Sequence, residues 1–166
     1  TDDVIGGILM PGDGAADPSG VTHMLAKGAR KHGAQIFEKS PVDEILTKDG
    51  KISGVKVNGH KIDCEYIVLA SGMWSRQIGE KAGVSIPLYP AEHFYIITEP
   101  IENLSKTLPV VRDFDNRTYI KEDAGKILVG IFEGNSIPAW NKTNKVPEDF
   151  SFGEFQENFE HFEPYL

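Results

Sequence analysis

Residues 62–83 constrain the fold of this chain more than any other segment. A polar lead-in runs into the apolar stretch 66–70 (YIVLA), and two small residues and a short helical pattern follow. This order predicts a buried strand, a tight turn and a helix over residues 74–82. In an open α/β sheet, the phosphates or ribose of a cofactor approach the backbone at such a junction. Because the chain contains no G-x-G-x-x-G, we expect it to be the middle of a larger cofactor enzyme.

Length and composition narrow the class of protein. The 166 residues are enough for a domain with a core, and 40% hydrophobic and 25% charged residues are typical of a soluble globular protein. A net charge of −8 argues against a nucleic-acid partner. Cys64 is the only cysteine, which excludes an intrachain disulfide and a cysteine metal cluster. No apolar run approaches the roughly 20 residues of a membrane helix, so we expect no membrane partner.

Residues 1–3 do not resemble a natural N-terminus, and residues 164–166 do not resemble a natural C-terminus. We therefore expect the chain to be a fragment of a longer protein. We expect a cytoplasmic location, or the mitochondrial matrix in a eukaryote.

The first half predicts one helix followed by short strands. Ser19 is the expected helix cap, and Gly33 is the expected helix stop. Asn58-Gly59 is a strong hairpin signal between two strands. Strands are predicted at 34–38, 42–47, 52–57, 61–62 and 66–70, with at most a short one at 8–10.

The second half predicts an antiparallel sheet. Mixed aromatic and β-branched segments predict strands at 93–98, 108–112, 117–121 and 126–132. Phe155, Phe159 and Phe162 in the tail fit one face of a helix, and they need something to pack against, within this chain or outside it. The order therefore predicts a nucleotide-binding half followed by a substrate-type sheet.

Four segments, in this order, carry a resemblance to a known family: residues 11–18 (PGDGAADP), 28–42 (GARKHGAQIFEKSPV), 67–93 (IVLASGMWSRQIGEKAGVSIPLYPAEH) and 109–123 (PVVRDFDNRTYIKED). The chain resembles the amine-oxidising flavoproteins of the D-amino-acid oxidase superfamily, and within it the dimethylglycine and sarcosine dehydrogenases. The resemblance implies a mixed α/β (α+β) fold in two parts. Residues 1–83 would be a partial Rossmann-like FAD-binding half with an inserted β-meander, and residues 84–166 an antiparallel substrate-domain sheet with a tail.

The resemblance also implies where FAD would be held. A valine matching Val42 presents backbone groups to the adenine end of FAD in this family. Ala70, Ser71, Gly72 and Trp74 form the second cofactor element, where small residues let the backbone approach the ribityl chain and pyrophosphate. From the residues alone, apolar burial favours a plain strand residue at Val42, and a tight turn that needs small residues for packing is the alternative for the second element.

On the substrate side, the resemblance points to His93 and Tyr119. An imidazole near the amine suits proton control there, because hydride leaves the carbon only when the nitrogen lone pair is free. A phenol can hydrogen-bond the substrate carboxylate. The alternatives are a structural histidine and a sheet aromatic. The spacing of the histidines predicts no metal site.

The substrate carboxylate of this family calls for a cation. Arg112, Arg117 and Lys121 are candidates by position. For Arg112 we favour a structural pairing with Asp113 or Asp115 instead, because it lies in an apolar strand.

The implied activity is oxidative demethylation of an N-methylated amino acid, such as dimethylglycine or sarcosine, by hydride transfer to FAD. In this group FAD is attached through a histidine that would lie outside this chain, tetrahydrofolate is a further implied cofactor, and the electron acceptor is left open. One alternative is a non-catalytic regulatory paralogue of the same family, like the phosphatase-regulating subunit. Another is that these 166 residues fold as a scaffold piece without a ligand.

Overall fold

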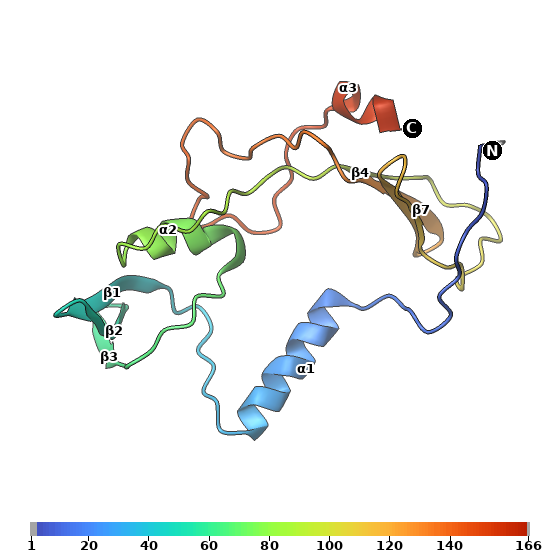
Figure 1. Ribbon diagram of the computed structural model, residues 1–166. Coiled ribbons are helices and arrows are strands. Elements are labelled where there is room, and N and C mark those ends of the chain that lie inside the picture. Colours follow the sequence, from blue (N-terminus) through green and yellow to red (C-terminus); the bar gives the residue numbers. More distant parts are fainter. Residues whose placement is uncertain (1–2, 166) are drawn as a thin grey trace. The chain divides into compact units, whose positions relative to one another are not determined.

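The computed structural model describes residues 3–165 and combines helices with antiparallel sheets (Figure 1). The predicted mixed α/β class is confirmed. The chain forms two compact units, one from the residues up to 36 together with 95–132 and 165, and the other from 37–94 and 133–164. The functional division at residue 83 stays a prediction, because these units group residues by contact and not by function.

The first unit begins with helix α1, Pro18–Lys31. Its cap is Asp17 and not Ser19, because the Asp17 carboxylate accepts hydrogen bonds from the first free N–H groups of the helix. Ser19 was the wrong choice because Pro18 already occupies the first helical position. The helix ends before Gly33, whose φ of +90° makes the predicted left-handed stop. No residue of α1 is buried.

The first unit also contains a four-stranded antiparallel sheet in the order β4-β7-β6-β5. Figure 1 shows β4 and β7 running side by side. The four predicted strands are confirmed: two have narrower bounds than predicted, and the two at 111–113 and 118–123 end one and two residues later than predicted. Leu128 and Ile131 of β7 are buried and form its apolar core. The strands are β4 (Tyr95–Ile97), β5 (Val111–Asp113), β6 (Thr118–Asp123) and β7 (Lys126–Ile131).

The second unit begins with a three-stranded antiparallel sheet, β1-β2-β3 (Figure 1). The predicted hairpin at Asn58-Gly59 is confirmed, with φ of 49° and 79° at its two turn residues, and Asp49-Gly50 makes a second turn of the same kind with φ of 52° and 74°. This geometry matches the right-handed twist of the strands. The strands are β1 (Val42–Lys48), β2 (Lys51–Val57) and β3 (His60–Asp63).

Two predicted strands are wrong, and the short strand that the sequence allowed at residues 8–10 does not form. Residues 8–10, 34–38 and 66–70 have no strand structure, and Tyr66 and Val68 are 86% and 90% exposed. An apolar run becomes a strand only when a neighbouring strand takes its N–H and C=O groups, and the described residues form no ladder with these segments. The apolar pattern at 66–70 therefore specifies an extended segment here and not a buried strand.

The helix after residues 66–70 is confirmed, although it is shorter than predicted. It consists of the 3₁₀ turn η1 (Gly72–Trp74) and α2 (Ser75–Glu80). Lys81, just beyond α2, donates through Nζ to the carbonyls of Val42 (3.4 Å) and Asp43 (3.2 Å), which ties the end of this helix to β1.

Two aromatic residues of the tail, Phe155 and His161, have ring contacts within the second unit, and the tail does not form one helical face. Helix α3 covers only Phe159–Phe162 and continues as η2, Glu163–Tyr165. Phe155 lies outside the helix, where its ring meets the edge of Trp140 at a centroid distance of 5.2 Å. Phe162 is buried while Phe159 is 68% exposed, so the predicted row of three phenylalanines is wrong.

Across residues 3–165, no helix has the length and apolar character that a membrane span requires.

Candidate functional site

The predicted cofactor turn, residues 70–72, has an accessible backbone. Ala70 is exposed, and a side-chain carbon added at Gly72 would meet no atom within 4 Å. Gly72 has a φ of +54°, which favours glycine. The Ser71 hydroxyl lies 3.2 Å from the Ser75 hydroxyl, inside the turn. Small residues in an extended segment without ladder partners fit the close approach of a phosphate or sugar group, so this turn is compatible with FAD.

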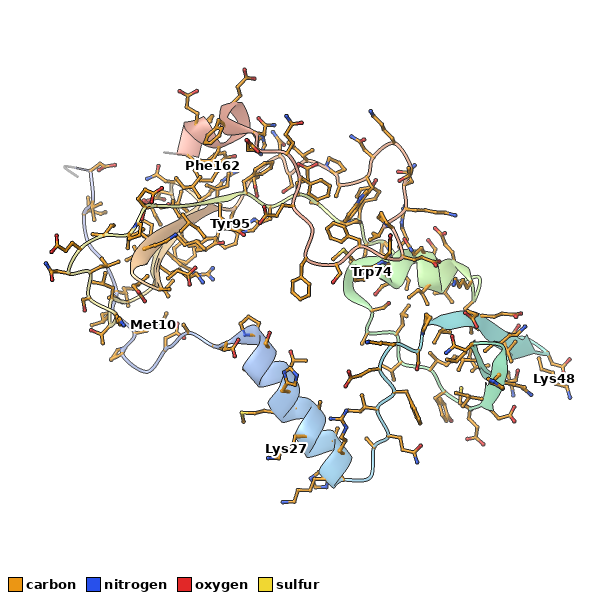
Figure 2. The ribbon with its side chains drawn as sticks, turned by 180° about the vertical axis from the view of Figure 1, so that it is seen from behind. Met10, Lys27, Lys48, Trp74, Tyr95 and Phe162 are labelled. Atoms are coloured by element: carbon orange, nitrogen blue, oxygen red, sulfur yellow. The ribbon has the colours of Figure 1, made fainter. Side chains whose placement is uncertain are left out.

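Trp74 has a structural contact of its own. Figure 2 shows it at the beginning of α2. Its side chain is half-buried, and its indole N–H donates to the Pro147 carbonyl at 3.1 Å. Gln77, one turn further on, donates to the Val146 carbonyl at 3.1 Å and accepts from the Val146 N–H at 3.0 Å. This first part of the helix therefore holds the loop at residues 144–147.

Val42 is half-buried at the start of β1 and pairs with Val57. The Val42 carbonyl already accepts a long hydrogen bond from Lys81, so part of its hydrogen-bonding capacity is taken up within the protein. Val42 and residues 70–74 all belong to the second unit. Their role in binding FAD stays a prediction.

His93 lies beside a nearly buried carboxylate. Its Nδ1 is 3.6 Å from Oε2 of Glu133, whose side chain is only 3% exposed, while the His93 side chain is 46% exposed. The other carboxylate oxygen, Oε1, accepts from the Phe94 N–H at 3.0 Å. A carboxylate removed from water is costly unless it is paired, and these two groups stabilise it.

Two hydrogen bonds of the adjoining backbone bring this pair together. The Glu92 N–H donates to the Ile137 carbonyl at 2.8 Å, and the Ala139 N–H donates to the Pro90 carbonyl at 3.0 Å, so that Ala91 forms a β-bridge with Pro138. The segment before His93 therefore runs antiparallel to the segment after Glu133.

A second histidine contacts Phe94, the residue that follows His93. The His161 ring packs against Phe94 with centroids 5.0 Å apart. Its Nε2 is buried and has no hydrogen-bond partner among the described residues. His161 belongs to α3.

Tyr119 lies in the first unit, on β6, with its ring tilted against Phe132 at a centroid distance of 5.3 Å. Directly opposite on β7 is Gly130, where an added side-chain carbon would collide with the Tyr119 ring. Glycine therefore makes room for this tyrosine. These contacts belong to a sheet aromatic and leave its proposed substrate role untested. His93 belongs to the other unit.

The basic candidates near Tyr119 have other contacts than expected. The Arg112 guanidinium lies over the Phe132 ring, 5.3 Å from its centroid. The Asp113 carboxylate accepts from the backbone and side-chain N–H groups of Asn116 at 3.0 and 2.8 Å, and these bonds lower the pKa of Asp113. The Arg117 carbonyl accepts from the Phe132 N–H at 2.7 Å. Asp113 therefore stabilises a turn and is not the ion-pair partner proposed for Arg112.

No group of three histidine, cysteine or acidic side chains within residues 3–165 could hold a metal ion.

Sequence reasoning missed Glu133. It follows β7 in a Gly- and Ser-containing loop and carries no motif, so its charge suggested only a solvated surface. Its contacts with residues 93 and 94 arise from pairing across about 40 residues of chain. The one available signal was its position directly after the predicted strand 126–132.

One solved structure and one family model define the class of fold. L-Proline dehydrogenase from P. horikoshii aligns with a TM-score of 0.69 at 28% identity, over 90% of this chain and 37% of that structure. The family model for FAD dependent oxidoreductases (DAO) matches residues 1–165. The chain therefore belongs to the FAD-dependent oxidoreductase family.

Curated relatives place it within that family. 4-Methylaminobutanoate oxidase (formaldehyde-forming) of Paenarthrobacter nicotinovorans is 38% identical over 97% of this chain and 19% of its own length. Human mitochondrial sarcosine dehydrogenase is 34% identical over 99% of this chain and 18% of its own length. The mitochondrial pyruvate dehydrogenase phosphatase regulatory subunit of Mus musculus is also 34% identical, over 99% of this chain and 19% of its own length. The chain spans less than a fifth of each of these relatives.

Proposed function

We propose that the whole protein oxidises an N-methylated amino acid of the dimethylglycine or sarcosine type, with FAD as hydride acceptor. The observation that carries this proposal is the identity of 34–38%, over nearly the full chain, with relatives named for oxidising a methylamino acid. Bound FAD would supply the hydride acceptor for the carbon attached to nitrogen. The iminium left on the substrate would hydrolyse to the demethylated amine and formaldehyde, or its one-carbon unit would pass to tetrahydrofolate.

The residues of this chain would bind, orient and control protons. Val42, Ala70, Ser71, Gly72 and Trp74 would hold FAD, mainly through the accessible backbone of the turn. His93 would take or hold the amine proton, supported by the charge of Glu133 3.6 Å away. Tyr119 would donate a hydrogen bond to the substrate carboxylate.

The same proposal covers the attachment of FAD, the one-carbon acceptor, the substrate and the location of the protein. FAD would be attached covalently through a residue outside this chain, and tetrahydrofolate would accept the one-carbon unit. The partner is a small N-methyl amino acid, and the electron acceptor is left open. The location would be cytoplasmic, or the mitochondrial matrix in a eukaryote, in keeping with the mitochondrial relatives.

The test uses the full-length protein purified with its FAD. After acid precipitation, flavin that stays with the pellet supports covalent attachment, and flavin in the supernatant contradicts it. Formaldehyde is then measured with sarcosine, dimethylglycine and 4-methylaminobutanoate, using unmethylated glycine as control. Formaldehyde from one N-methyl amine supports the activity.

A second candidate is a regulatory protein without catalysis. The identity with the phosphatase regulatory subunit, equal to that with sarcosine dehydrogenase, favours it as the alternative. A protein that binds no FAD and cannot be reconstituted with it would overturn the enzyme proposal in favour of this one.

A further inference from the structure

We propose that Glu133 is a positioning residue that sets the tautomer of His93, an inference that deepens the proposed function and rests on it for its catalytic consequence. Glu133 is the acidic side chain whose carboxylate lies 3.6 Å from His93 Nδ1, and it is almost fully withdrawn from water.

Burial gives this carboxylate its effect. Between exposed groups, water would screen most of the attraction between a carboxylate and an imidazole. The Glu133 side chain is only 3% exposed, so its charge acts through a medium of lower dielectric constant. The hydrogen bond from the Phe94 N–H to Oε1 fixes the carboxylate and leaves Oε2 directed at His93.

The geometry selects one form of the neutral imidazole. A negative charge next to Nδ1 favours the proton on that nitrogen, and Nε2 is then the proton acceptor of the ring. With its lone pair fixed at Nε2, His93 has one defined atom through which to take a proton from an amine. The His93 side chain is 46% exposed, so a small molecule can reach it while its carboxylate partner stays covered.

The variant that isolates the charge is Glu133→Gln. Glutamine has nearly the same volume, and its side-chain oxygen can still accept from the Phe94 N–H, so we expect the fold to be kept. Glu133→Asp keeps the charge on a shorter side chain. Glu148→Gln, at an exposed glutamate of the same unit, is the matched control.

The first readout is the side-chain ¹⁵N spectrum of the full-length protein labelled at histidine, recorded at about pH 8.5, where imidazole is neutral. His93→Gln assigns the resonances. We expect a protonated Nδ1 in the unmodified protein and in Glu148→Gln, a mixture of tautomers in Glu133→Gln, and a return toward protonated Nδ1 in Glu133→Asp. An unchanged tautomer ratio in Glu133→Gln overturns the inference, whether or not the protein oxidises amines.

The second readout is the rate of flavin reduction by the amine substrate. Glu133→Gln should slow it about tenfold, yet change it less than about twofold in a His93→Gln background, because the two residues act as a unit. Equal slowing in both backgrounds would show a merely structural role and overturn the inference. If no amine reduces the flavin, the proposed function fails, and the spectrum alone decides the inference.

Discussion

Gly130 and Tyr119 lie opposite each other, and the Tyr119 ring fits there because Gly130 has no side chain. A carbon added at Gly130 would overlap the Tyr119 ring opposite. Gly130→Ala should therefore lower the free energy of unfolding by about 1–3 kcal/mol, because the ring has to move out of its place against Phe132. Urea denaturation measures this change.

Gly28→Ala in α1 is the control for this substitution, because a carbon added there meets no atom within 4 Å. It should stabilise the helix by up to about 1 kcal/mol. An equal response of both variants would contradict the described contact between Tyr119 and Gly130.

Asp113 gives a prediction for pH. Its hydrogen bonds to Asn116 lower its pKa below the unfolded value. A lowered carboxyl pKa adds stability that is fully present above the unfolded pKa of about 4 and is lost as pH falls through the folded pKa. The stability difference between the unmodified protein and Asp113→Asn should therefore shrink below about pH 4. Thermal unfolding at a series of pH values measures it, and a difference that grows toward acid would contradict the assignment.

Helix α1 depends on its cap more than a packed helix would, since none of its residues is buried. Asp17→Ala removes the acceptor of two backbone N–H groups and should destabilise the helix by about 1 kcal/mol. Ser19→Ala should have little effect, because the Ser19 side chain is not the cap. Helical circular dichroism measures both variants, and a larger loss in Ser19→Ala would restore the cap predicted from sequence.

Helix α2 holds the loop at residues 144–147 through Gln77, which makes both hydrogen bonds of the Val146 peptide groups. Val146 is buried, so Gln77→Ala leaves both groups without this partner. The expected loss is about 1–3 kcal/mol in the free energy of unfolding. Gln156→Ala, at an exposed position of the same unit, should change it by less than about 0.5 kcal/mol.

Elements with local causes were predictable from sequence. Asp49-Gly50 and Asn58-Gly59 specify their turns through their own backbone preferences, and the helix near residue 18 has its cap and stop within a few positions. The strand predicted at residues 66–70 does not form, because a strand also needs a neighbouring strand, which an apolar pattern does not supply.

The residues of the candidate site also differ in whether they could be predicted from sequence. Residues 70–72 could be chosen from sequence, because small residues mark a turn where the backbone is accessible. Glu133 could not, because its role arises only when it meets residues 93 and 94 across about 40 positions. Gly130 likewise has meaning only opposite Tyr119.

On the scale of the whole molecule, membership of the FAD-dependent oxidoreductase family is established over residues 1–165, while the chain spans less than a fifth of its curated relatives. Activity is therefore a property to be measured on the whole protein. The chain supplies candidate parts for it: an accessible turn in one unit, the His93–Glu133 pair in the same unit, and Tyr119 in the other.

The most direct test is to add sarcosine, dimethylglycine or 4-methylaminobutanoate without oxygen to the full-length protein and to follow its visible flavin absorption. The account predicts that at least one of these N-methyl amines bleaches the flavin bands, as dithionite does in the control. Bands that dithionite bleaches and that none of the three amines changes would contradict the account.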